Sequence, residues 1–399
     1  MSDRVSERRE VWITGAGLLS CLGEGLEANW QKLVSDNPPA AHDDKTFAPY
    51  VTHPLAPVNF DLQIPKKGDQ RQMEPWQRIG VYAAGLALAN AGVVGNAEIL
   101  DTMDMIIAAG GGERDIAVDS AIMSGIKAAA NPGAFLNERL ASDLRPTLFL
   151  AQLPNLLAGN IGIVHGVVGT SRTFMGEEAA GVDALRVSLA RVAAGQSEIS
   201  LVSSSFHGTR WDLLLVTELG RNLLKAPFKP VWDRGNHGGL AMADMGASLV
   251  IESREHAEKR GAKPIARLVA VESDRNKRQP GEIETTLASE WAAIEPKVRK
   301  ESAVVISGAS GLEPPTSEEK HALAKIGLPV RATGSHIGHG FDTQFLANVA
   351  IACETLRQDK LFPACGSGDT GEGPANISQA VITSVGNWRG EGLALIEKI

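Results

Sequence analysis

The sequence predicts an α/β protein built from two similar halves, each with a βαβαβ-like order of elements. Short apolar runs alternate with amphipathic stretches along the 399 residues, which is typical of sheets covered by helices on both faces. The order repeats: Met103–Gly112 and Ala303–Gly311 are both apolar runs that end in glycines. The 42 glycines and the 5% aromatic content suit tight strand-to-helix turns and close helix contacts. We therefore expect an internal pseudo-two-fold axis.

The first half is expected to alternate strands with helices. Trp76–Ala91 is the strongest helix prediction, because its apolar residues recur at helical spacing. Gly15 and Gly17 are expected to form a turn after a short strand, and Pro132–Pro146 is expected to be a connection. The glycine turn lacks the third spaced glycine of a nucleotide loop, so nucleotide binding is disfavoured. The strands are expected at Val11–Thr14, Met103–Ala109, Ser171–Phe174, Ile199–Ser203 and Ala247–Glu252, and the other helices at Leu26–Val34, Asp115–Ala130 and Val182–Ala194.

The second half is expected to follow the same order. A loop containing Trp211 and Trp232 lies between the last two strands of the first half. After it, the strands are expected at Ile265–Ser273, Ala303–Ser307, Gln379–Val385 and Gly392–Glu397, and the helices at Glu255–Arg260, Ile283–Ile294, Ser317–Ile326 and Phe341–Asp359.

Composition excludes several classes of function. The formal net charge of −8 and the lack of a dense Lys/Arg run argue against nucleic-acid binding. Three scattered cysteines indicate reduced thiols in a cytoplasmic protein. Met1–Glu10 has no apolar core of a signal peptide, and no apolar run reaches the roughly 18–20 residues of a membrane span. His336 and His339 have no Cys or carboxylate at ligand spacing, so no metal is expected.

The stretch Thr173–Gly181 is the strongest candidate site. It follows a β-type run and opens an amphipathic helix, and a strand that turns sharply into a helix is where enzymes place a nucleophile. The helix N-terminus there offers partial positive charge and free N–H groups. Glu178 stands where such a turn would carry Cys or Ser.

Four motifs, in order, resemble those of the β-ketoacyl-acyl-carrier-protein synthases. They are Val11–Gly17 with Leu22-Gly23, Leu153–Asn160, the segment from Trp232-Asp233-Arg234 to Gly246-Ala247, and Ser335–His339. The resemblance runs over nearly the whole chain. It implies a thiolase fold, in which two pseudo-symmetric βαβαβ halves form a five-layered αβαβα core. The halves are expected at residues 1–253 and 254–399.

The departures from this family fall at its functional positions. The family's nucleophilic Cys falls at Glu178, its first catalytic His at Ala309, and the Lys that precedes its second His at Gly334; only that second His survives, as His339. The threonines that bind the phosphopantetheine arm fall at Gly311 and Glu313. The glycine-rich gate falls at Gly386, Asn387, Trp388 and Arg389, where bulky side chains replace glycines.

Elementary chemistry favours an inert site. An acyl–Glu anhydride is too labile to hold a growing chain, and a carboxylate repels malonate. We therefore expect Glu178 to cap its own helix turn, and His339 to be a hydrogen-bonded remnant in the core. A role of Glu178 as a decarboxylation base or as a partner-facing residue is the alternative. Because the lost groups would normally act as a unit, their joint loss favours lost condensation.

The resemblance then implies a non-condensing subunit, like a chain-length factor, that pairs with an active β-ketoacyl-acyl-carrier-protein synthase. Family dimers associate through the strand before the nucleophile turn, here around Ser171 and Thr173, which brings Phe149 and Leu150 close to the partner's acyl tunnel. Polyketides, aryl polyenes and very long acyl chains are products that need such a device. The alternatives are a malonyl-carrier decarboxylase and a divergent synthase active in its own right; a homodimer also stays open. No cofactor is expected beyond the 4′-phosphopantetheine of acyl carrier protein.

Overall fold

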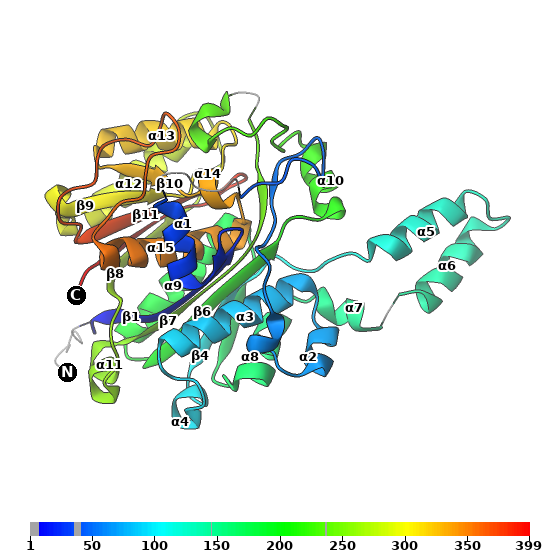
Figure 1. Ribbon diagram of the computed structural model, residues 1–399, viewed down its shortest axis with the longest axis horizontal. Coiled ribbons are helices and arrows are strands. Elements are labelled where there is room, and N and C mark those ends of the chain that lie inside the picture. The colour runs from blue at the N-terminus through cyan, green and yellow to red at the C-terminus, as the bar shows by residue number, and fades with distance from the viewer. Residues whose placement is uncertain (1–7, 36–40, 145, 236–237) are drawn as a thin grey trace, which may run out of the picture.

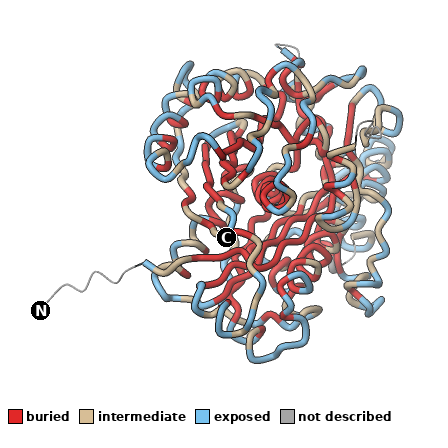
Figure 2. The backbone as a smooth tube through the Cα atoms, turned by 60° about the vertical axis from the view of Figure 1, so that its left-hand side comes forward, coloured by how far each residue is buried: buried red, intermediate tan, exposed pale blue. Residues whose placement is uncertain are grey.

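The chain forms five layers of alternating helices and strands (Figure 1). The structure is a computed structural model that describes residues 8–35, 41–144, 146–235 and 238–399. In Figure 2 the buried residues follow the strands and the helices between the two sheets, so the core occupies the three inner layers. This confirms the predicted α/β thiolase-type architecture.

The two halves have the same strand order and the same strand directions. The strands of the first half lie in the order β5 (Ser171–Phe174), β4 (Asp104–Ala108), β6 (Ile199–His207), β7 (Met242–Ser253) and β1 (Val11–Ser20). Those of the second half lie in the order β10 (Val330–Ala332), β9 (Ala303–Ser307), β11 (Gln379–Val385), β12 (Glu391–Glu397) and β8 (Ala266–Asp274). In each half, the first two pairings are parallel and the next two are antiparallel. The pseudo-two-fold expected from the repeat is therefore present in the sheet.

The two sheets meet at one short antiparallel junction between β1 and β8. Trp12 pairs with Arg267 and Ile13 pairs with Ala266. The predicted division of the chain at residues 253 and 254 falls between the end of β7 and the start of α11 (Arg254–Arg260). As a domain boundary it stays a prediction.

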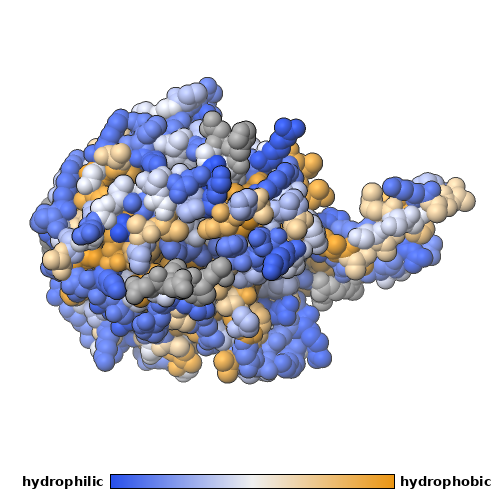
Figure 3. Space-filling view, turned by 45° about the horizontal axis from the view of Figure 1, so that its top comes forward, coloured by the Kyte–Doolittle hydropathy of each residue, from blue (hydrophilic) through white to orange (hydrophobic). Residues whose placement is uncertain are grey.

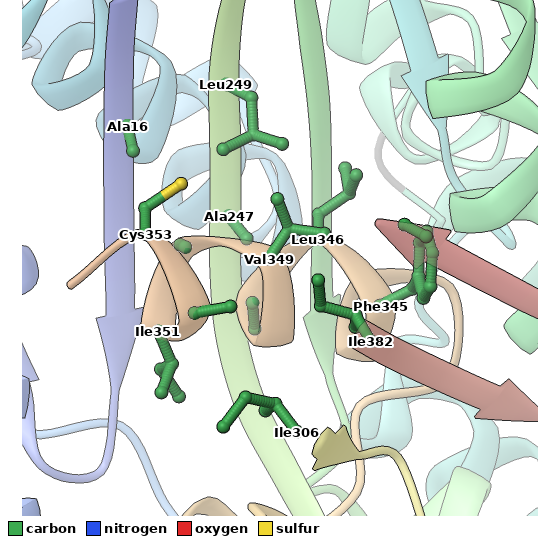
Figure 4. Packing of buried hydrophobic residues seen from close by; sticks show 14 of the residues in the cluster. Ala16, Ala247, Leu249, Ile306, Phe345, Leu346, Val349, Ile351, Cys353 and Ile382 are labelled. Carbon is green, nitrogen blue, oxygen red and sulfur yellow. The ribbon is translucent and has the colours of Figure 1, made fainter. Parts of the chain in front are cut away.

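Two helices fill the space between the sheets. They are α9 (Glu178–Ala193) and α15 (Gln344–Gln358), and α15 is buried over nearly its whole length. Figure 4 shows its apolar side chains, among them Phe345, Leu346 and Val349, reaching residues of both sheets such as Leu249 and Ile382. A helix that buries nearly every side chain has to be enclosed in this way.

The outer layers consist of amphipathic helices. Helices α3 (Pro75–Asn90) and α8 (Leu156–His165) cover the first sheet, and α12 (Glu282–Ile294) and α13 (Pro315–Ile326) cover the second (Figure 1). The remaining elements are α1 (Gly25–Leu33), α2 (Lys67–Gln72), α4 (Ala97–Leu100), α7 (Pro146–Ala151), α10 (Trp211–Leu219), α11 (Arg254–Arg260), α14 (Gly334–Ile337), β2 (Gly23–Glu24) and β3 (Thr52–His53).

Three local predictions were wrong. Gly15 and Gly17 lie inside β1, because α3 crosses that strand so closely that a Cβ on Gly15 would lie 2.7 Å from the Cβ of Ala91. The expected connection at Pro132–Pro146 contains α6 (Pro132–Ser142), whose N-cap side chain of Asn131 accepts a hydrogen bond from the N–H of Ala134. The expected loop around Trp211 contains α10.

A helical hairpin projects from the body of the molecule. It consists of α5 (Ile116–Ile126) and α6, which we call the arm (Figures 1 and 3). Along these two helices, Ile122 is the one fully buried side chain among the described residues. Because almost no side chain of these helices is buried, the arm gains little stability from its own packing. Isolated helices of this length are marginal in water. Among the described residues, no helix is long and apolar enough to cross a membrane.

Candidate functional site

A pocket of about 700 Å³ lies at the turn between β5 and α9. Glu177 is the N-cap residue of α9 and has φ 60° and ψ −140°, a conformation that costs a non-glycine residue energy and that clusters at functional sites. No pattern in the sequence predicts this strained backbone, and the candidate residue predicted from the sequence is its neighbour Glu178. The other walls come from the glycine run after β4, the end of β6, α10 and the turn after β11: Gly110–Glu113, Ser205–His207, Arg210, Leu213, Val216, Leu240, Phe341, Asp342 and Asn387–Arg389.

Glu178 points away from this pocket and into the core. Its Oε1 lies 2.9 Å from Nε2 of His339, and the two side chains are 2% and 1% exposed. The expectation that Glu178 caps its own turn is therefore wrong, because its carboxylate binds a histidine from the other half of the chain. His339 is a hydrogen-bonded core residue, as expected.

Asp342 is a third carboxyl group beside this pair, and the sequence analysis missed it. Burial, and then the negative charge of Glu178, raise the pKa of Asp342 to about 8. Its Oδ1 is buried without a hydrogen-bond partner among the described residues. Helix α9 packs so tightly here that a Cβ on Gly181 would lie 2.5 Å from the backbone oxygen of Asp342. The carboxyl group is thus held neutral at pH 7 by its surroundings.

Residues 309 and 334, where the family's first His and its Lys are expected, lie in tightly packed surroundings. Ala309 is 2% exposed, and a Cβ on Gly334 would lie 2.6 Å from the Ala309 backbone oxygen and 3.0 Å from Cγ1 of Val231. There is no space at residue 334 for any side chain, and so none for a lysine.

Arg234 fills the space beside Gly311. A Cβ on Gly311 would lie 2.6 Å from Cδ of Arg234 and would collide with its Nη1. That guanidinium is 5% exposed and donates to the backbone oxygens of Gly239 at 2.6 Å and Ser310 at 2.9 Å. The other expected pantetheine position, Glu313, accepts a hydrogen bond from the N–H of Ser317 at the start of α13. Neither position carries a threonine hydroxyl, as the sequence shows, and the motif that contains Arg234 did not predict that its guanidinium lies beside Gly311.

The gate turn, residues Gly386–Gly390, is tied to the loop that follows β8. Nη2 of Arg278 donates to the backbone oxygens of Gly386 at 2.6 Å and Gly390 at 3.3 Å, while Nη1 pairs with the buried Glu391. Arg278 has φ 60°, so its backbone is strained in the conformation that makes these bonds. Trp388 and Arg389 stand exposed at the pocket mouth.

The predicted dimer and tunnel residues lie on the surface, outside the pocket. Phe149 and Leu150 on α7 are 71% and 50% exposed. Ser171 and Thr173 lie on β5, the last strand of the sheet in the described part of the chain, and pair with β4 on one side. The structure does not bring these four residues together with Glu178 and His339 in one site.

His207 and Asp244 form an ordered pair in the pocket wall. Nδ1 of His207 lies 2.9 Å from Oδ1 of Asp244. Burial works to lower the pKa of His207, but the hydrogen bond and the charge of Asp244 outweigh it and raise the pKa. Nearby, Oε1 of Glu113 accepts a hydrogen bond from the N–H of Trp76, which caps the start of α3.

Among the described residues there is neither a candidate metal site nor a disulfide. No group of three or more His, Cys, Asp or Glu side chains there could hold a metal ion. Cys21 and Cys353 are buried free thiols, and Cys365 is half-buried. Burial raises the pKa of Cys353 to about 12, which makes it an inert core residue.

The fold and the site define a class of protein: a two-sheet α/β protein of the thiolase type with an elbow that carries carboxylates in place of a thiol. The sequence profile of the beta-ketoacyl synthase N-terminal domain matches residues 8–257. The chain belongs to the β-ketoacyl synthase family.

Curated relatives and solved structures agree with this placement. The chain is 24% identical over 277 residues to a 3-oxoacyl-[acyl-carrier-protein] synthase 2 of Vibrio harveyi (66% of this chain, 62% of the relative) and 26% identical over 282 residues to one of Rhizobium meliloti strain 1021 (65% and 63%). These matches therefore span less than two thirds of the relatives' length.

Two solved structures have TM-scores of 0.79 and 17% identity over 98% of this chain and 100% of theirs: a beta-ketoacyl synthase from Burkholderia phymatum STM815 and the ishigamide ketosynthase/chain length factor. At that identity, the likeness shows the fold.

Proposed function

We propose that this chain is a non-condensing subunit that pairs with an active β-ketoacyl-acyl-carrier-protein synthase in fatty-acid or polyketide synthesis. The observation that carries the proposal is the Glu178–His339 hydrogen bond. Glu178 places a carboxylate at the position expected for the nucleophile, and this carboxylate binds His339, the one surviving histidine. A carboxylate that is turned into the core and paired there is not available to accept an acyl group.

The closed positions support loss of condensation. Residue 334 has no space for a side chain, and Arg234 occupies the space beside Gly311. Each change is matched by packing around it, so restoring one group requires several others to move. Such accommodation fits a chain that performs a different task from condensation.

The arm supports association with a partner. Its apolar side chains include Met123 and Leu140, which are 61% and 45% exposed, and α7 at its base adds Phe149 and Leu150 (Figure 3). Exposed apolar side chains that gather on one part of a surface are typical of protein–protein contact sites. A second subunit against the arm would bury this surface and stabilise two helices that gain little from their own packing.

Strand β5 supports the same arrangement. It lies at the end of the sheet in the described part of the chain, and its residues Ser171 and Arg172 are exposed. An open strand edge is a template for pairing with another chain. A strand of the partner added here would extend the sheet across the two subunits.

Two structural neighbours are compatible with such a complex. One is a ketosynthase/chain length factor, and another is a type II polyketide acyl carrier protein in complex with its ketosynthase. For this chain we accordingly propose a synthase subunit as the direct partner and acyl carrier protein as a partner of the complex.

Co-expression with a cysteine-containing synthase from the same gene cluster tests the proposal. We expect a stable 1:1 complex by native mass spectrometry, and elongation of acyl carrier protein substrates only when both subunits are present. Phe149→Asp should weaken the complex, whereas Val94→Asp, at an apolar residue that is also exposed (64%) but lies between α3 and α4, should not. A stable homodimer that consumes malonyl carrier protein by itself would contradict the proposal.

A further inference from the structure

Two carboxyl groups from different halves of the chain face the same pocket. Glu177 belongs to the turn before α9, and Asp342 follows α14 in the second half. Their positions are fixed by the backbone, because α9 contacts the segment of Asp342 at Gly181 with no room for a Cβ. The strained backbone of Glu177 aims its side chain into the pocket, while Glu178 turns into the core.

Both groups keep an unused hydrogen-bonding atom. Oε2 of Glu177 and Oδ1 of Asp342 are buried without a partner among the described residues, and Asp342 is 2% exposed. Buried polar atoms in native proteins are almost always paired with protein, water or a ligand. These two atoms can therefore bind a polar group in the pocket.

The two carboxyl groups have different electrostatic surroundings. Burial and the charge of Glu178 hold Asp342 protonated at neutral pH, since its pKa is raised to about 8. Burial and then Glu178 also raise the pKa of Glu177, but Arg389 and Arg278 oppose this. A neutral carboxylic acid beside a second carboxyl group, whose ionised form Arg389 and Arg278 favour, is an arrangement for acid–base chemistry.

We propose that this pocket hydrolyses acyl thioesters, with Glu177 as the general base and Asp342 as the hydrogen-bond donor to the carbonyl oxygen. Glu177 takes a proton from water as the water oxygen attacks the carbonyl carbon. The oxyanion that forms accepts a hydrogen bond from the protonated Asp342. The carbon–sulfur bond then breaks, and the thiolate takes the proton from Glu177, which yields a carboxylic acid and a thiol.

The pocket suits a neutral ester with an apolar tail. Its volume of about 700 Å³ lies in the range of small-molecule sites. Phe206, Leu213, Val216 and Leu240 provide apolar walls for an acyl chain. Glu177 would repel a malonyl carboxylate, whereas Arg210 and Arg389 in the same lining would attract one, so it is the apolar walls that favour simple acyl thioesters. Water as the attacking group needs no nucleophilic thiol at the elbow.

The test uses the purified full chain and octanoyl-N-acetylcysteamine, with octanoate and free thiol measured by mass spectrometry. Glu177→Gln should lower the rate at least ~100-fold, because it removes the base but keeps the shape. Asp342→Leu should lower it by a similar factor of ~100, whereas Asp342→Asn keeps a donor and should retain more activity. Glu98→Gln, at an exposed acid on α4, is the control and should leave the rate unchanged. Thermal melting of each variant checks that it is folded.

A single turnover in ¹⁸O water separates a base from a nucleophile. We expect one ¹⁸O in the octanoate and none in the peptide that contains Glu177. Label in Glu177, no hydrolysis by the wild-type chain, or an unchanged rate in Glu177→Gln would each overturn the proposal. This inference does not rest on the proposed pairing with a synthase: hydrolysis is measured on the isolated chain, whereas pairing is measured by complex formation.

Discussion

Oε1 of Glu178 and Nε2 of His339 lie 2.9 Å apart in a site that excludes solvent, and they come from opposite halves of the chain. The bond joins the start of α9 to the segment after α14, so it links the two halves across the middle layer. It also turns the carboxylate of Glu178 away from the pocket. Glu178, at the position expected for the nucleophile, and His339, the one retained histidine, are therefore partners of each other.

Breaking this pair should destabilise the protein. Glu178→Ala leaves the buried Nε2 of His339 without a partner, which should lower the free energy of unfolding by about 3 kcal/mol. Glu178→Gln keeps a side-chain oxygen at the same place and should cost less. Urea denaturation followed by circular dichroism measures both. Equal losses in the two variants would contradict a hydrogen bond as the source of the stability.

Restoring the two missing catalytic residues should not restore condensation. The double variant Glu178→Cys, Ala309→His regains the thiol and the imidazole, but residue 334 still has no space for a lysine, and Arg234 still lies beside Gly311. We expect no 3-oxoacyl product by mass spectrometry with acyl and malonyl carrier proteins as substrates. An active synthase assayed in parallel is the positive control. Any 3-oxoacyl product would show that the closed positions are not what prevents condensation.

The contact between Gly311 and Arg234 should appear as a coupling energy. Gly311→Thr introduces a Cβ that collides with Arg234 at a residue with φ 85°, so it should cost more than about 2 kcal/mol of stability. Part of that cost is backbone strain, which remains when the neighbour is removed. The other part should vanish in Gly311→Thr, Arg234→Ala. A double-mutant cycle from urea denaturation gives the difference, and simple additivity would contradict the clash.

Arg278 should hold the gate turn in place. Arg278→Ala removes donors to Gly386 and Gly390 and leaves Glu391 buried without its cation, so we expect a loss of about 3 kcal/mol and faster hydrogen exchange at residues 386–390. Adding Glu391→Gln should recover part of the stability but not the slow exchange of the turn. Unchanged exchange in Arg278→Ala would show that the turn is held by other contacts.

The contribution of Glu290 to stability should fall as pH rises from about 5 to 8. Burial, and then the charge of Glu391, raise the pKa of Glu290 to about 8, whereas the unfolded chain has an ordinary carboxyl pKa. Between these values the folded state binds the extra proton, so folding is favoured at the lower pH and loses free energy as pH rises. Asp342 acts in the same direction.

Glu290→Gln should therefore flatten this dependence. The variant should gain stability over the wild type at pH 8, of the order of 2 kcal/mol, and differ little at pH 5. Urea midpoints at the two pH values measure the effect. A parallel fall in wild type and variant would assign the pH dependence to other groups.

Much of the fold was predictable because it is encoded in local patterns. Apolar runs such as Ala303–Ser307 and Gln379–Val385 have the same bounds in the structure as in the prediction, since a buried strand needs a continuous apolar run. The helix predicted from residue 76 is shifted by one residue. The helices α6 and α10 were missed; α6 has no buried side chain and α10 buries Leu214, so neither has the buried apolar stripe of a helix that packs on a core.

The sequence by itself determined the family and predicts the loss of the catalytic residues, because both depend on which residue types stand in which motif. Tertiary structure alone decided what replaced them. Glu178 and His339, Glu177 and Asp342, and Gly311 and Arg234 are each far apart in the chain, and no local pattern shows that they meet. They meet because the two halves pack face to face around α9 and α15, and burial in that layer then sets their hydrogen bonds and their charges.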